Sequence, residues 1–189
     1  MQGYGTWITL GVLVLIGLWL IGGFNGLVSL RQRCRQAFAD IDVQLKQRHD
    51  LIPNLVETVK GYAAHERSTL DAVVKARSTA QSAQGPAAQA IAESQLTGAL
   101  SRLMMLTEAY PELKANQNFR DLQSQLGDIE NKLAAARRFF NNSAAEYNAT
   151  REGFPVMLFA APFGFAPQVF FDLGDGERAA ESTVPRVAF

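Results

Sequence analysis

The architecture of this 189-residue chain follows from one run near its start, Trp7-Ile-Thr-Leu-Gly-Val-Leu-Val-Leu-Ile-Gly-Leu-Trp-Leu-Ile-Gly-Gly-Phe24. The first charged side chain is Arg31, so with its uncharged flanks the run reaches the roughly 20 residues that a helix needs to cross about 30 Å of hydrocarbon. A cleaved signal peptide would carry basic residues before the run and a small-residue cleavage site after it, and a core helix would show a polar face. Neither pattern is evident, so residues 1–30 are predicted to be a retained transmembrane anchor.

Arginines mark one end of the predicted anchor. Arg31, Arg33 and Arg35 follow it directly, and no Lys or Arg precedes it. Because positive charge favours the cytoplasmic side, the short N-terminus is predicted to lie outside and the rest of the chain in the cytoplasm. The single cysteine, Cys34, suits a reducing compartment. Over the whole sequence 18 basic residues balance 18 acidic ones, so the basic excess typical of proteins that bind nucleic acid is missing.

From Leu27 onward, and through residues 31–153, the pattern is helical, without strand-like alternation. Apolar residues recur every three or four positions, first at Leu27, Leu30, Cys34, Phe38, Ile41 and Leu45. They recur again at Phe119, Leu122, Leu126, Ile129, Leu133, Ala136, Phe140 and Tyr147, a run that is broken only by Ser143. Gly85-Pro86 and Pro111 divide the region, and Gly153 with Pro155 ends it. Pro53 lies either in the first turn of a new helix or at a kink in a continuous one. The prediction is an all-α fold, in which the N-terminal transmembrane helix continues into a long antiparallel bundle of three to four helices.

Residues 154–189 form a third region, an irregular tail rich in Phe, Pro and Gly. Prolines at this density exclude a long helix. A segment this apolar has three alternatives: it packs back on the bundle, it contacts a membrane, or it contacts another subunit. The residues predicted to make membrane or subunit contacts are Phe159, Phe163, Phe165, Phe170 and Phe171.

No pattern in the sequence predicts catalysis. His49 and His65 lie far apart, and the residues after His65 do not complete a His-Glu-x-x-His motif. Both histidines are predicted to be surface or internally satisfied side chains, and Cys34 a packing residue close to the membrane. No Gly-x-Ser-x-Gly elbow accompanies the serines. The sequence therefore predicts no catalytic residue, no metal site and no cofactor.

Two sets of residues are candidates for an oligomer interface. Gly22 and Gly26 form a small-xxx-small pair at the cytoplasmic end of the anchor, a spacing that lets membrane helices approach closely. Asp42, Lys46 and Asn54 lie among mixed charges around Pro53. The simpler interpretations are that glycine is common in membrane helices, and that the charged stretch, Arg48 included, is a solvated face with Asp42 and Lys46 paired four residues apart.

Several long motifs, in order, resemble the bacterial LemA family. They are Asp40-Ile-Asp-Val-Gln-Leu-Lys-Gln-Arg-His-Asp-Leu-Ile-Pro-Asn-Leu-Val-Glu-Thr-Val-Lys-Gly-Tyr62, Glu108-Ala-Tyr-Pro-Glu-Leu-Lys-Ala-Asn116, Arg137-Arg-Phe-Phe-Asn141, Glu146-Tyr-Asn148, Phe154-Pro155 and Phe163-Gly-Phe165. The resemblance implies an N-terminally anchored helical bundle in a bacterial envelope, with no established enzymatic activity. It also implies association with a membrane zinc protease of the HtpX type, and a magnetosome relative suggests a role in shaping membranes.

Two functional hypotheses follow. The first is a non-enzymatic scaffold of the bacterial inner membrane that self-associates and organises or remodels the bilayer. The alternative is an adaptor or accessory subunit of another envelope protein, such as an HtpX-type protease. The predicted partners are the lipid bilayer and other copies of the chain, with a membrane protease as a further partner and no nucleic acid.

Overall fold

The computed structural model describes residues 2–172, with side chains for residues 7–172. Within that range the chain forms helices and no strand. The helices are α1 (Gln2–Lys60), α2 (Arg67–Ser82), α3 (Pro86–Thr107), α4 (Pro111–Ala115), α5 (Gln117–Glu152) and α6 (Met157–Ala160). The prediction of an all-α fold is confirmed. The last part of the predicted tail, residues 173–189, lies outside the described residues.

Helix α1 contains the predicted apolar segment. Its most apolar 18-residue window has a mean hydropathy of 2.2, and none of that window is buried inside the protein. The helix continues through Pro53 to Lys60. Of the two alternatives for Pro53, the structure therefore shows one continuous helix and not a new helix that begins there. Gly61 follows, and its N–H donates to the carbonyl of Glu57 at 3.2 Å, which closes the last turn.

The chain divides into two compact units. Among the described residues, the anchor unit comprises residues 2–37 and 139–169, and the bundle unit comprises residues 38–138 and 170–172. Both α1 and α5 therefore contribute to each unit. The division differs from the sequence regions 31–153 and 154–189, because residues 139–169 pack with the first part of α1.

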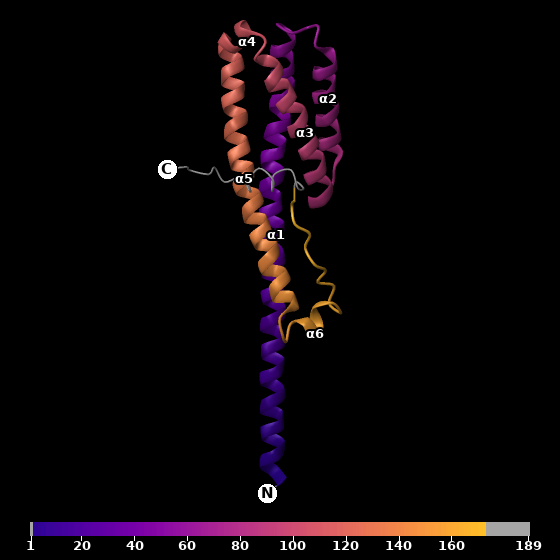
Figure 1. Cartoon of the computed structure of the whole chain (residues 1–189). Helices are drawn as coiled ribbons and strands as arrows, with labels where there is room; N and C mark the ends of the chain where they lie inside the picture. The colour runs from indigo at the N-terminus through magenta and orange to yellow at the C-terminus, as the bar shows by residue number, and fades with distance from the viewer. Residues whose placement is uncertain (1, 173–189) are drawn as a thin grey trace, which may run out of the picture. The chain divides into compact units, whose positions relative to one another are not determined.

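The bundle unit contains the end of α1, all of α2, α3 and α4, and the start of α5. Its successive long helices alternate in direction, and α2 lies beside α3 (Figure 1). The turn between them has Gly85 at φ 80°, a conformation that suits glycine, and Pro86 in the first turn of α3. Its core includes Ile52, Leu55, Val59, Val73, Leu96, Leu103, Leu113 and Phe119.

The anchor unit is held together by the end of α5 and the segment that follows it. The last part of α5 lies beside α1 (Figure 1), and the small core contains Leu27, Cys34, Tyr147, Ala160 and Phe165. The Tyr147 hydroxyl donates to the carbonyl of Ala166 at 2.9 Å. Asn148 binds Gln168 twice, donating to its carbonyl at 2.9 Å and accepting from its N–H at 2.8 Å. The segment after α5 is thereby fixed to the anchor unit.

Candidate functional site

The anchor unit exposes an apolar surface on the segment after α5. We call it the apolar collar and define it as Phe154, Met157, Leu158 and Phe163, of which Phe154 is 78% and Phe163 64% exposed. It belongs to the same unit as the exposed apolar side chains of α1 from Trp7 to Ile21. Exposed apolar surface of this extent is typical of a membrane or protein contact.

Close packing against α1 sets the position of the collar. A Cβ added to Gly23 would lie 3.2 Å from the Phe159 ring, so glycine permits the approach. The ring of Phe24 meets Phe163 and Phe165 edge to face, with centroids 5.6 and 5.3 Å apart. The collar is thus attached to α1 within two turns of Arg31.

The backbone of the collar satisfies many of its own hydrogen bonds. The N–H groups of Met157, Leu158, Phe159, Ala160, Phe163, Gly164 and Phe165 all donate to carbonyls between Gly153 and Ala161. Pro155 and Pro162 have no N–H to satisfy. Because an unpaired backbone group is costly in hydrocarbon, this pairing makes the segment compatible with shallow insertion into a bilayer.

A groove runs between the collar and α1. It has a volume of about 340 Å³ and is lined by Leu20, Ile21, Phe24, Phe159 and Phe163, all of them apolar. A second hollow of about 320 Å³ lies on another side of the same helix turn, where Gly22 and Gly23 face Pro155 and Val156.

Positive charge borders this apolar surface. The Arg31 guanidinium lies 4.9 Å from the centroid of the Phe165 ring, and Arg151 Nε donates to the Phe165 carbonyl at 2.7 Å. Arg33 pairs with Glu146 at 2.9 Å. Burial raises the pKa of the Tyr147 phenol, an effect that Arg31 and Arg151 partly offset. Together with Arg35, the unit carries four arginines against two glutamates within residues 7–37 and 139–169.

The bundle unit contains a buried cluster of charges that sequence reasoning missed. Arg48 Nη1 lies 2.6 Å from Glu93 Oε2, and Arg48 Nη2 lies 2.6 Å from Glu130 Oε1. Nη2 also donates to Thr97 Oγ1 at 2.9 Å. His49 Nε2 lies 2.6 Å from Glu93 Oε1. The prediction of a solvated face was wrong for Arg48, whose side chain is only 2% exposed. The sequence predicted either a surface or an internally satisfied side chain for His49, and the structure shows the second.

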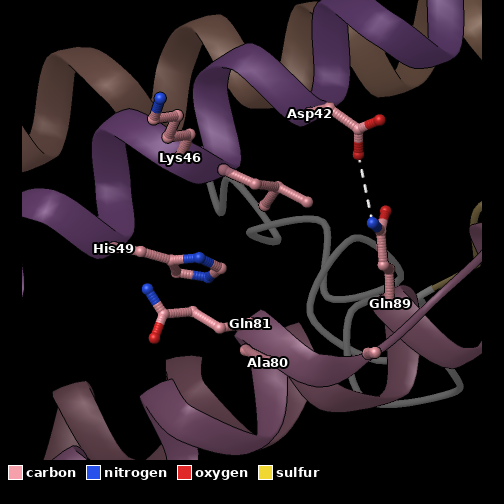
Figure 2. A pocket seen from close by; sticks show the side chains of 8 residues that line it. Asp42, Lys46, His49, Ala80, Gln81 and Gln89 are labelled. Carbon is pink, nitrogen blue, oxygen red and sulfur yellow. Dashed lines mark hydrogen bonds between the residues drawn. The ribbon is translucent and has the colours of Figure 1, made fainter.

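A polar hollow of about 240 Å³ lies beside this cluster, between α1 and the α2–α3 hairpin. Figure 2 shows the His49 ring and the Gln81 amide facing each other across it, while the Lys46 side chain is directed away from Gln81. Asp42 Oδ1 accepts a hydrogen bond from Gln89 Nε2 at 3.1 Å. The predicted pairing of Asp42 with Lys46 is therefore replaced by a contact to α3. Among the described residues, no group of three or more His, Cys, Asp or Glu is arranged to hold a metal ion.

The structure places the other predicted residues in different environments. Gly22 and Gly26 are exposed, and a Cβ added to either would meet no atom within 4 Å among the described residues. Lys46 and Asn54 are exposed in the bundle unit. Phe163 and Phe170 are exposed and Phe159 is half-buried, whereas Phe165 and Phe171 are buried within the chain. The collar residues Phe154, Met157 and Leu158 were not among the predicted contacts, although their apolar character is visible in the sequence.

Comparison with known proteins finds two similar magnetosome proteins and one family model. Magnetosome protein MamQ of Magnetospirillum gryphiswaldense is 25% identical over 178 residues, covering 80% of this chain and 65% of that protein. Magnetosome protein MamQ 2 of Paramagnetospirillum magneticum is 23% identical over 178 residues, with the same coverage. The chain thus spans just under two thirds of the length of these curated relatives. The family model that matches is that of the LemA family, over residues 37–189. With most of its sequence matched by that model, the chain belongs to the LemA family.

Proposed function

We propose that this membrane-associated LemA-family protein is a non-enzymatic scaffold that self-associates and organises or remodels the bacterial inner membrane. The observation that carries the proposal is the apolar collar beside the membrane helix. The collar exposes four large apolar side chains in the same unit as a helix apolar enough to cross a bilayer. The similarity to two relatives named as magnetosome proteins adds support to this proposal.

The position of the collar suggests how one leaflet would be affected. Residues 24 to 31 of α1 span about 10 Å at 1.5 Å per residue. With Arg31 at the level of the headgroups, the contacts of Phe163 with Phe24 put the collar a few ångströms inside the hydrocarbon. Interfacial segments insert to about 5–10 Å. A wedge at this depth expands only the leaflet that it enters, which favours bending of the bilayer.

Reducing the apolar character of the collar should weaken this effect. With Leu158→Ser and Phe163→Ser together, we expect the full chain to remain anchored in reconstituted vesicles but to deform them less, because two exposed apolar groups leave the leaflet. Vesicle shape is measured by electron cryomicroscopy at fixed protein-to-lipid ratio. Ile91→Ser with Met105→Ser is the matched control, because both residues are exposed on α3 in the bundle unit. Equal loss of deformation in both pairs, or none in the collar pair, would refute the role of the collar.

Self-association is tested with the detergent-extracted protein. Gly22→Leu with Gly26→Leu adds bulk at two exposed positions, where a Cβ would meet no atom of the described residues within 4 Å. The hollow between Gly22 and Pro155 leaves room for the new side chain at position 22, so the monomer should still fold. Particle size of the detergent-extracted protein should fall if this face is an interface. Gly11→Leu with Gly17→Leu is the control on the same helix. Wild-type monomers that co-purify with a second protein would instead support the adaptor alternative.

Membrane topology gives an independent prediction. A cysteine introduced at Gln84, an exposed position just before Gly85, should resist impermeant thiol reagents in intact cells and react after lysis. Cys34 can remain in place, because its side chain is buried and burial raises the pKa of its thiol, which lowers the reactive thiolate fraction at neutral pH. Labelling of the new cysteine after permeabilisation of the outer membrane alone would contradict the cytoplasmic assignment.

A further inference from the structure

We propose that the anchor unit holds an anionic phospholipid, with an acyl chain in the groove between α1 and the collar and the phosphate at Arg31. The inference rests on the proposed membrane role and names the class of lipid that the surface selects. It follows from the lining of the groove, from the unused hydrogen-bonding capacity of one arginine and from their alignment along α1.

The groove has the chemistry of an acyl-chain site. Its lining residues are Leu20, Ile21, Phe24, Phe159 and Phe163, and its volume is about 340 Å³. Three of its lining residues belong to α1, whose apolar side chains are exposed along the predicted span. The lipids around a membrane helix supply hydrocarbon chains. A hydrocarbon chain would therefore be the occupant of the groove, and it would fill the groove without leaving a polar group unpaired.

Arg31 is the arginine best placed to bind a phosphate. Its Nε is buried and has no hydrogen-bond partner among the side chains that the structure describes. Its guanidinium carbon lies 4.9 Å from the centroid of the Phe165 ring, a cation–π contact that holds the guanidinium beside that ring. The other arginines have different surroundings, since Arg33 pairs with Glu146 and Arg151 donates to the Phe165 carbonyl. Because that Nε is buried, a phosphate diester would accept hydrogen bonds from the outer nitrogens of the Arg31 guanidinium.

The groove and Arg31 are aligned as the two ends of one lipid. Ile21, Phe24, Val28 and Arg31 recur at intervals of three and four residues, so they lie on one face of α1. From Ile21 to Arg31 the helix rises about 15 Å, which matches half of a bilayer's hydrocarbon thickness. With the phosphate at Arg31, the acyl chain of the same molecule extends toward Phe24 and Ile21. Net positive charge in the anchor unit favours an anionic over a zwitterionic headgroup.

The test counts lipids retained by the full chain in detergent, by native mass spectrometry. Phosphatidylglycerol and phosphatidylcholine with identical acyl chains are the probes. We expect wild type to retain phosphatidylglycerol with at least about tenfold higher affinity. Arg31→Gln should lower that affinity about tenfold, as expected for loss of a charge-assisted hydrogen bond, whereas the exposed Arg35→Gln should change it less than about threefold. Equal effects at Arg31 and Arg35 would overturn the proposal.

A second variant tests the groove without touching the arginine. Ile21→Trp fills the groove and should weaken retention of both lipids about tenfold, while Leu13→Trp, also exposed on α1 but outside the groove, should leave retention unchanged. Unchanged retention in Ile21→Trp would overturn the proposal. Vesicle deformation by the same proteins separates this inference from the proposed function. Deformation without selective retention refutes only the lipid site, and selective retention without deformation or self-association refutes only the scaffold.

Discussion

Glu93→Ala should lower the free energy of unfolding of the bundle unit by about 3–5 kcal/mol, the usual cost of removing one partner from a buried ion pair. Glu93 accepts from Arg48 at 2.6 Å and contacts His49 Nε2 at 2.6 Å, and the side chains of Arg48 and Glu93 are both 2% exposed. The variant leaves the Arg48 charge buried with Glu130 as its remaining ion-pair partner. Chemical denaturation of the full chain, followed by circular dichroism in detergent, measures the loss.

The matched control is Glu57→Ala on α1. Glu57 also forms an ion pair, with Lys60 at 3.2 Å, but both side chains are largely exposed. An exposed pair of this kind contributes about 0–1 kcal/mol, so this variant should unfold close to wild type. If Glu93→Ala and Glu57→Ala had the same small effect, the cluster would be solvated and Arg48 would not organise the bundle. A large effect confined to Glu93 establishes that the buried charges hold α1 and α3 in register.

The helices of the bundle unit were predictable because their signals are local. Gly85-Pro86 and Pro111 separate helices as expected from the backbone limits of glycine and proline. The burial of Arg48 was not predictable in the same way, because arginine is rarely buried and its partner Glu93 is 45 residues away in the sequence. The only local signal is the position of Arg48 between the buried residues Leu45 and Ile52, on the apolar face of α1.

In the aromatic tail, too, the burial of individual side chains was not predictable from local sequence. The composition of the tail indicates that its phenylalanines need an apolar environment. It does not indicate which of them are buried within the chain itself. Phe163 and Phe165 are separated only by Gly164, yet the first is 64% and the second 1% exposed. Gly164 has φ 74°, a conformation that glycine adopts without strain, and it turns the chain so that the two rings meet different surroundings. The distinction depends on α1 and Tyr147, which are distant in the sequence.

Phe165→Ala should therefore release the segment after α5 from the anchor unit. Truncating a buried phenylalanine costs about 3–5 kcal/mol, and here it also removes the ring contacts to Phe24 and Arg31. Amide hydrogen exchange of the full chain in detergent measures the release at two sites. The Phe165 N–H donates to Ala160 and the Gln168 N–H to Asn148, and we expect protection of both to fall about a hundredfold or more.

Phe163→Ala is the paired variant, and the two changes should act on different properties. Because the Phe163 ring is exposed, its removal should change amide protection less than about threefold while reducing the apolar surface that the collar offers to lipid. Flotation with vesicles cannot report this for a protein that keeps its membrane helix, so vesicle deformation is the appropriate second measurement. If Phe163→Ala lost protection as strongly as Phe165→Ala, the exposed ring would be part of the core and would not belong to the surface that the collar offers to the membrane. If instead Phe165→Ala kept its protection, the hydrogen bonds of Asn148 and Tyr147 would suffice to hold the segment, and the Phe165 ring would be dispensable for positioning the collar.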